Sequence, residues 1–470
     1  MFYLFFSLSF LLLMPFILKK NKNNNKILKI LVIIYCIIIF IVTITLPDAY
    51  VRCFDNNELT HSLKDIIYAL VRWFNALNFV ILPIAVFYNN QIIRKIAKYF
   101  SLPMIIISII CYPIHLQNYT STLGRGLNSI DILSASFKKF LINPIFRSII
   151  QGIIWLLELS IIIMLSKKNK TKINIKEIPK YLVILIFLLI SSIPIYIPQH
   201  LFGYSNIIFD KWTLPHLLWI LFIIIEILVL NKIFKNKPKE IKKILCLILS
   251  LSLFLQYNQM FGAISMSIKR LPFQLCNIGA YLILLSLITE NKRIFNFTLI
   301  VNVIGVLFAL FLPDLDGEGL FYLYNMHFIF EHTNVLVVPL LALSLKLFPK
   351  LDQKALKDCL LGFTIYFVFV LIIGTLFNAI ALKTNNSFYE ANYLFMFNQT
   401  VATNFIEPLG KLFNNQIKIG NYIVLYPVIQ LVVYITFIVL CTILYYIIRL
   451  IYIIKDKKSN VCKDQICKTL

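Results

Sequence analysis

The chain has 470 residues, of which 60% are hydrophobic and 14% are charged, and its formal net charge is +24. Such an apolar composition excludes a soluble globular protein and predicts a membrane protein. A charge of this size would favour nucleic-acid binding in a soluble chain, but here the basic residues gather in short segments between apolar runs. That arrangement is typical of membrane orientation, and we expect no nucleic-acid partner.

Thirteen apolar runs come close to the length of about 20 residues that a helix needs to cross a membrane. We therefore predict an all-α fold, a polytopic transmembrane helix bundle of about 13 spans in the cell membrane. In chain order the runs are residues 2–18, 30–46, 66–88, 102–115, 149–165, 181–197, 214–230, 244–260, 272–287, 295–312, 327–345, 360–382 and 422–454. The first run lacks a charged segment before it and a cleavage site after it, so we expect a retained helix.

The basic segments between the runs predict how the bundle is oriented. They occur in alternate connections, at residues 19–29, 94–98, 167–180, 232–243, 292–293, 346–357 and 455–458. Because basic loops stay on the cytoplasmic side, the N-terminus should lie outside and the C-terminus inside. The connection 117–147 is an exception, since it is basic but falls outside. Its apolar residues at helical spacing favour a helix lying on the membrane surface: Ile130, Leu133, Phe137 and Leu141.

Three parts of the chain follow from this pattern. Residues 1–200 form an N-terminal bundle of about six spans, residues 211–454 a domain of seven helices, and residues 455–470 a basic cytoplasmic tail. The segment 392–397 is apolar but too short to cross, which favours a re-entrant segment. A faint internal echo relates residues 71–74 and 269–272, because each leads through a helix and a basic turn to a returning helix. Duplication and chance similarity both stay open.

Polar side chains concentrate at the predicted outer ends of the spans. All six histidines lie there or in outer loops: His61, His115, His200, His216, His327 and His332. A single polar residue at a span end is ordinary because the interface is wet, but their concentration on one side favours a binding site. His327 and His332 are five residues apart and share a helical face poorly, so we expect them to have different roles.

The segment 270–277 brings a cation, a thiol and two amides to the start of the ninth span. Arg270 and the helix N-terminus would activate the Cys276 thiol as a nucleophile, with a histidine from another span as the base. The alternative is that Cys276 packs as a small hydrophobe and that Gln274 makes an interhelical hydrogen bond.

We expect neither a metal nor a cofactor. The nine cysteines are scattered and show no disulfide framework. Cys462 and Cys467 in the polar tail are too few for a zinc site, and no H-x-x-x-H pair occurs. The chain also has no GxGxxG or Walker pattern for a nucleotide.

Two acids, Glu158 and Glu226, lie inside predicted spans. An ionisable group in that position suggests a function, for example a proton relay. The other interpretation is a structural ion pair, such as one between Glu226 and Arg449 of the last span.

Three motifs occur in order along the second half of the chain, at residues 271–277 (LPFQLCN), 327–339 and 392–396 (NYLFM). This ordered set resembles the YwaF-type integral membrane proteins over residues 211–454. The resemblance implies a relation to an animal transmembrane cysteine acyltransferase of ether phospholipids. It thereby implies lipid remodelling, in which an acyl chain is transferred through a thioester.

The chain departs from the family pattern at two positions. The family usually has histidine where this chain has Gln274, and the cysteine of the animal enzyme aligns near Phe273, not at Cys276. Glutamine cannot act as a general base at ordinary pH. If acyl transfer takes place at Cys276, the base would therefore have to be His332 or His216.

Three functions stay open. The first is a protein that handles or acyl-transfers a lipid substrate at an outward-facing cavity, with Cys276, His332 and His216 as catalytic residues. The substrate-binding residues expected around them are Arg270, Gln274, Asn277, His327, Glu331 and Asn392. The second function is a multi-pass transporter or lipid flippase, which the many spans and the two buried acids favour. The third is a non-catalytic membrane scaffold. Membrane lipids, with a lipid or small molecule as substrate, are the expected partners.

Overall fold

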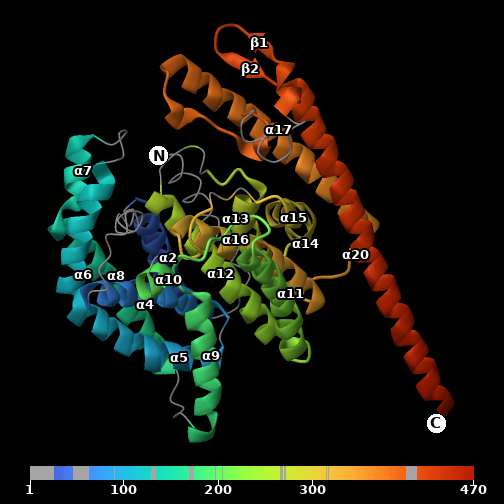
Figure 1. Cartoon of the computed structure of the whole chain (residues 1–470). Coiled ribbons are helices and arrows are strands. Elements are labelled where there is room, and N and C mark those ends of the chain that lie inside the picture. The colour runs from blue at the N-terminus through green and yellow to red at the C-terminus, as the bar shows by residue number, and fades with distance from the viewer. Residues whose placement is uncertain are drawn as a thin grey trace. The chain divides into compact units, whose positions relative to one another are not determined.

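The computed structural model describes residues 26–45, 63–88, 90–128, 134–168, 174–195, 197–203, 205–264, 268, 271–313, 315, 317–398 and 410–469. Within these ranges the chain is almost entirely helical (Figure 1). It divides into two compact units. Unit 1 is Met1–Leu228, Lys232–Met266 and Leu315–Asn334, and unit 2 is Val229–Asn231, Ser267–Asp314 and Val335–Leu470.

Nine helices of the described residues are long and apolar enough to cross a membrane: Lys26–Thr43, Leu70–Phe87, Gln91–Ile114, Pro144–Ser166, Leu214–Phe234, Lys292–Phe311, Leu323–Ser344, Gln353–Thr384 and Pro427–Ile454. They fit an all-α polytopic membrane protein. Of the other four predicted spans, 2–18 lies outside the described residues, and 244–260 falls in a helix with a charged first turn. The remaining two are helices of 14 and 15 residues, about 21 Å long at 1.5 Å per residue. The count of thirteen therefore stays a prediction.

Unit 1 is a helical bundle built on long apolar helices. Its elements are α2 (Lys26–Thr45), α4 (Leu63–Phe87), α5 (Gln91–Ile96), the π-helix η2 (Ala97–Ser101), α6 (Leu102–Asn128), α7 (Ala135–Ile142), α8 (Pro144–Lys168), η3 (Ile175–Glu177), α9 (Ile178–Ser191), α10 (Ile197–Phe202), α11 (Leu214–Phe234) and α12 (Lys239–Ile264). Helix α2 packs against α4, α8 and α12. The ring of Phe254 on α12 stacks on Phe40 of α2 and Phe79 of α4, with ring centroids 5.5 and 6.2 Å apart.

Two basic connections of unit 1 lie at the same end of the bundle. Lys95 on α5 donates to a carboxylate oxygen of Glu177 at 3.3 Å and to the Tyr181 hydroxyl at 2.9 Å. The Tyr181 hydroxyl itself donates to Glu177 at 2.6 Å. The hydrogen bonds from Tyr181 and Lys95 lower the pKa of the Glu177 carboxyl. The contact joins segments 94–98 and 167–180, which the alternation of basic loops also predicts on one side.

The basic connection that breaks the alternation contains a short helix. Helix α7 begins after Ser134, whose hydroxyl accepts a hydrogen bond from the amide of Phe137. Phe137 and Phe140 on α7 are both exposed. An exposed aromatic face on a helix too short to cross a membrane fits a surface position. Ile130 and Leu133 of the predicted surface helix lie outside the described residues.

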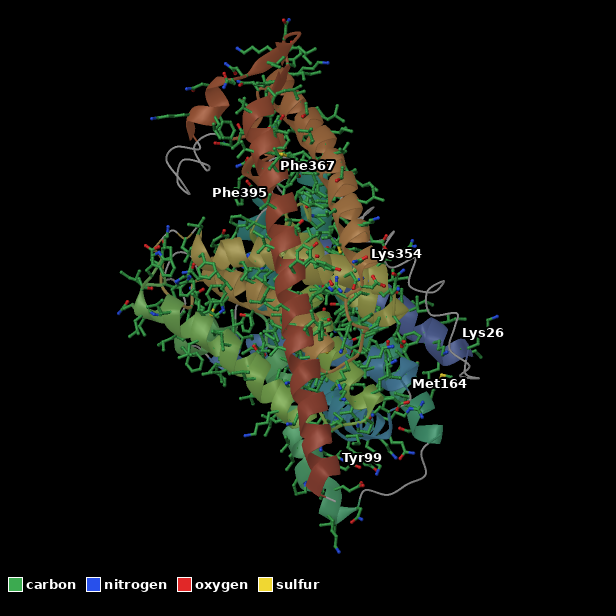
Figure 2. The ribbon with its side chains drawn as sticks, turned by 90° about the vertical axis from the view of Figure 1, so that its right-hand side faces the viewer. Lys26, Tyr99, Met164, Lys354, Phe367 and Phe395 are labelled. Carbon is green, nitrogen blue, oxygen red and sulfur yellow. The ribbon has the colours of Figure 1, made fainter. Side chains whose placement is uncertain are left out.

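Unit 2 contains α13 (Leu275–Thr289), α14 (Lys292–Phe297), the π-helix η5 (Thr298–Asn302), α15 (Val303–Phe311), α17 (Gln353–Thr384), η6 (Ser387–Tyr389), η7 (Tyr393–Phe395), η8 (Lys411–Asn414) and α20 (Pro427–Thr469). Helix α16 (Leu323–Ser344) begins in unit 1 and ends in unit 2. Helices α17 and α20 pack together through aromatic rings. Phe367, labelled in the middle of α17 in Figure 2, lies 5.1 Å from the ring of Tyr434 on α20.

A two-stranded hairpin of unit 2 precedes α20. Strands β1 (Ile417–Ile419) and β2 (Ile423–Leu425) pair antiparallel, with Ile417 opposite Leu425, Lys418 opposite Val424 and Ile419 opposite Ile423. The turn contains Gly420 at φ +63°, a conformation that glycine adopts without strain. The hairpin lies beside α17 (Figure 1).

The similarity between the segments that follow residues 71–74 and 269–272 extends to the backbone conformation. In unit 1, the Asn90 side chain caps the six-residue α5, which continues through the five-residue π-helix η2 into α6. In unit 2, the Asn291 side chain caps the six-residue α14, which continues through the five-residue η5 into α15. Because π-helical segments are rare, the same succession in both units favours duplication over chance similarity.

Close packing at Gly374 gives a prediction on stability. A Cβ atom at this α17 position would lie 2.5 Å from two ring carbons of the buried Phe397. We expect Gly374→Ala to displace the ring and to lower the free energy of unfolding by about 1–3 kcal/mol. Gly152→Ala on α8 is the control, since no atom lies within 4 Å of its added Cβ, and helix propensity alone should stabilise it by about 1 kcal/mol. Thermal unfolding in detergent measures both, and equal midpoints would contradict the prediction.

Candidate functional site

The residues expected at the site fall into two groups that belong to different units. His216, His327, Glu331 and His332 belong to unit 1, whereas Gln274, Cys276, Asn277 and Asn392 belong to unit 2. Arg270 lies outside the described residues. Unit 2 contains no histidine.

The first histidine of α16 makes a buried contact with a carboxyl group. Nε2 of His327 lies 2.9 Å from Oε2 of Glu331, one helical turn further along, and the side chains are 9% and 4% exposed. The ring of Tyr257 on α12 lies 6.0 Å from the His327 ring. A carboxylate only accepts hydrogen bonds, so His327 Nε2 carries the proton in this contact. The pair fixes the His327 ring.

The second histidine of α16 has one ring nitrogen without a hydrogen-bond partner among the described residues. Nδ1 of His332 lies 2.7 Å from the carbonyl oxygen of Phe328, and the two rings lie 4.2 Å apart. Because a carbonyl oxygen only accepts, Nδ1 carries the proton, and Nε2 of a neutral ring keeps its lone pair. His332 therefore has the tautomer that a general base requires. Its partner differs from that of His327, in keeping with the different roles expected from their spacing.

The histidine at the start of α11 is held in an aromatic cluster. The backbone N–H of Trp212 donates to Nδ1 of His216 at 3.3 Å, which places the proton of a neutral ring on Nε2. The rings of Phe209, Trp212 and Trp219 lie 5.7 to 6.0 Å from the His216 ring. His216 is fully buried. Its lone pair is already used, so it is a poorer candidate for a base than His332.

In unit 2, Gln274 fastens the predicted re-entrant segment to the start of α13. Its Nε2 donates to the carbonyl oxygen of Asn392 at 3.0 Å, and the amide of Leu394 donates to its Oε1 at 2.9 Å. Both ends of the Gln274 side chain therefore bind backbone groups about 120 residues away along the chain. This bonding fits the structural alternative for Gln274 better than a role in binding substrate.

The segment 391–398 is a tight, mostly buried turn held by the side chains of Asn392, Asn378 and Tyr393. Oδ1 of Asn392 accepts hydrogen bonds from the amides of Phe397 and Asn398, both at 3.0 Å. The Asn378 side chain on α17 bonds to both backbone groups of Ala391. The Tyr393 hydroxyl donates to the carbonyl oxygen of Ile268 at 2.6 Å. The segment contains the short η7, in which Leu394 and Phe395 both have a φ of 55°, and the side chain of Asn392 bridges this turn.

Cys276 and Asn277 are the two polar side chains of the first turn of α13 that stay partly exposed. A Cβ added at Gly305 of α15 would lie 3.7 Å from Sγ of Cys276. The thiol therefore lies next to α15, at a position where that helix has no side chain. The amide of Asn277 makes no hydrogen bond to any residue that the structure describes. The Asn277 amide, in contrast to the side chains of Gln274 and Asn392, is therefore available to a ligand.

Several residues that the sequence alone did not single out complete these clusters. Trp219 on α11 donates its Nε1 proton to the Thr333 hydroxyl at 2.8 Å, beside His332. The Tyr366 hydroxyl on α17 donates to the carbonyl oxygen of Phe273 at 2.6 Å. A buried tryptophan N–H or tyrosine O–H usually has a hydrogen-bond partner. A Trp or Tyr inside an apolar run is therefore the sequence feature that could have indicated these contacts. Across the described ranges, no group of three or more His, Cys, Asp or Glu side chains could hold a metal ion.

Comparison with known protein families gives a match. The model of the TMEM164 family, a family of transmembrane proteins, matches residues 208–446, which include both groups of site residues. The matched range coincides closely with the segment 211–454, over which the motifs resemble the YwaF-type proteins. That relationship stays a prediction. No curated protein and no solved structure matches the chain.

Proposed function

Because the chain belongs to the TMEM164 family, we propose that this integral membrane protein binds a membrane lipid at the start of α13 and transfers its acyl chain through Cys276. The observation that carries the proposal is the contrast within one helical turn. Gln274 is occupied by backbone groups, whereas Cys276 is half-buried and Asn277 has no hydrogen-bond partner among the described residues. Two consecutive residues in the first turn of α13 thus carry a thiol and an amide that has no hydrogen-bond partner among the described residues.

The chemistry would be an acyl transfer in two steps. The Cys276 sulfur attacks the ester carbonyl carbon of the lipid, a C–S bond forms, the C–O bond breaks, and the alcohol leaves with the thiol proton. A second alcohol then attacks the thioester and regenerates the thiol. The Asn277 amide supplies two N–H donors, the kind of group that stabilises negative charge on the carbonyl oxygen.

Labelling with a long-chain, thiol-reactive acyl probe tests this proposal on the purified full-length protein and on intact cells. We expect the wild-type chain to take up the probe and Cys276→Ser to lose the label. Hydroxylamine should release the label, because it cleaves thioesters. Asn277→Ala should slow labelling without removing the thiol, through loss of the amide donors.

Cys111→Ser is the matched control for this experiment. Cys111 on α6 is also half-buried and belongs to unit 1, outside the matched range. It should keep the full label. A label that persists in Cys276→Ser, or one that is lost equally from both variants, would leave Cys276 as a packing residue and would contradict acyl transfer.

A further inference from the structure

Helix α8 in the N-terminal bundle carries a line of polar residues on its buried face. Arg147, Gln151, Trp155 and Glu158 follow one another at spacings of four, four and three residues, so they share one face of the helix. Arg147, Gln151 and Glu158 are at most 2% exposed. This helix lies outside residues 208–446, so the family match does not account for the line.

The line ends at a carboxyl group enclosed by three helices. Oε1 of Glu158 accepts hydrogen bonds from the Tyr35 hydroxyl on α2 at 2.9 Å and from Nδ2 of Asn78 on α4 at 3.3 Å. All three side chains are at most 2% exposed. Helices α2, α4 and α8 pack against one another here.

Two oxygen atoms of this cluster accept no hydrogen bond from a described residue. Oε2 of Glu158 and Oδ1 of Asn78 are buried and have no hydrogen-bond partner among the described residues. A buried acceptor without a donor destabilises the fold, and a buried carboxylate without a counter-charge does so more strongly. If Glu158 is ionised, the cluster therefore contains one negative charge that no positive charge compensates.

A proton supplies that charge better than a metal cation does. A cation such as Ca²⁺ takes six to eight oxygen ligands, whereas Glu158 is the one carboxylate in this cluster. A proton needs one acceptor, and the free oxygen of Asn78 provides it. A rotation of the Asn78 amide by half a turn about its terminal C–C bond exchanges the places of its nitrogen and oxygen. The same amide can therefore donate to the carboxylate or accept from the carboxylic acid.

We propose that Glu158, with Tyr35 and Asn78, is a proton-binding site at the point where α2, α4 and α8 meet. In the ionised state the carboxylate accepts from Tyr35 and from the Asn78 amide nitrogen. In the protonated state the carboxyl O–H donates to the Asn78 oxygen, and the Tyr35 bond persists. No other bond breaks or forms, so binding and release of one proton turns the Asn78 amide and changes the contact between α8 and α4.

Tyr35 is the one titratable group in hydrogen-bond contact with Glu158 among the described residues. Other titratable or charged side chains occur on the elements packed against α8, and none of them bonds to Glu158. Among the described side chains they are Lys26, Lys29 and Cys36 on α2, Arg72 on α4, Lys98 and Tyr99 on η2, Cys111 and Tyr112 on α6, Lys139 on α7, and Arg147 on α8 itself. A signal from this site therefore belongs to Glu158.

Difference infrared spectroscopy of the full-length protein in lipid vesicles, titrated with pH, tests the proposal. The C=O stretching band of a carboxylic acid should grow as the pH falls in the wild-type protein and should be lost in Glu158→Gln. Tyr35→Phe removes one hydrogen bond to the carboxyl group but keeps the ring, so it should shift the position of the same band. This milder variant provides a readout even if Glu158→Gln does not fold.

Glu226→Gln, which changes the other intramembrane acid, should keep the band assigned to Glu158. Three outcomes would overturn the proposal. The band could survive unchanged in Glu158→Gln, it could stay at the same position in Tyr35→Phe, or it could respond to NaCl at constant pH and not to pH. The last outcome would assign the cluster to a cation.

Discussion

Gln274→Ala should release the turn 391–398 from α13. The substitution removes two hydrogen bonds, to the carbonyl oxygen of Asn392 and from the amide of Leu394. These backbone groups then lose their partners at a half-buried position, which costs about 1–3 kcal/mol for each. We expect the free energy of unfolding to fall by about 2–6 kcal/mol and the Leu394 amide to exchange its hydrogen much faster. Hydrogen exchange followed by mass spectrometry in detergent measures the second effect directly.

Asn277→Ala is the matched control for this prediction. Asn277 lies on the same first turn of α13, but its amide makes no hydrogen bond to a residue that the structure describes. Its removal should leave both the unfolding midpoint and the exchange of Leu394 within error of the wild type. If Gln274→Ala exchanges no faster at Leu394 than Asn277→Ala does, the clamp does not hold the turn.

This clamp illustrates what the sequence alone can predict. The segment LPFQLCN shows that polar groups stand at the start of an apolar helix, and a polar group there needs a partner. The sequence does not show which partner. The bond from Gln274 closes a loop of more than 100 residues, so it depends on how α13 and the turn pack and leaves no local signal.

The helices were more predictable than their contacts. In a membrane every backbone N–H and C=O needs a partner within the segment, so a long apolar run has few alternatives to a helix. Nine predicted spans are accordingly helices of sufficient length. The π-helices η2 and η5, which interrupt two of these helices, were not predicted, because the sequences AKYFS and TLIVN contain no signal that separates a π-helix from an α-helix.

The two intramembrane acids also show that a sequence can mark a residue as unusual without showing its partners. Glu158 stands out in the sequence because it is ionisable within an apolar run, and such a residue is expected to have a function. Its partners are Tyr35 and Asn78, which are ordinary residues of other helices. The proposed pairing of Glu226 with Arg449 has no support in the hydrogen bonds of Arg449, which donates to Tyr445 at 3.2 Å. It stays a prediction.

Glu331→Ala should be among the most destabilising single substitutions in unit 1. It leaves Nε2 of His327 buried without its carboxylate partner at 2.9 Å. Leaving a buried donor without its acceptor costs about 1–3 kcal/mol, and more where a charged group is involved, because the remaining group is neither solvated nor paired. We expect a clear fall in the thermal unfolding midpoint in detergent. Glu331→Gln keeps an oxygen acceptor at the same place and should recover most of the lost stability.

An exposed ion pair separates the effect of burial from that of charge. Nε of Arg293 lies 3.3 Å from Oδ2 of Asp358, with side chains 65% and 25% exposed. Such a pair contributes about 0–1 kcal/mol, because water screens both charges. Asp358→Ala should therefore change the midpoint far less than Glu331→Ala, although both substitutions remove a carboxylate that contacts a basic side chain. Equal effects would mean that water reaches His327, and α16 would then present its histidines to solvent and not to the interior of unit 1.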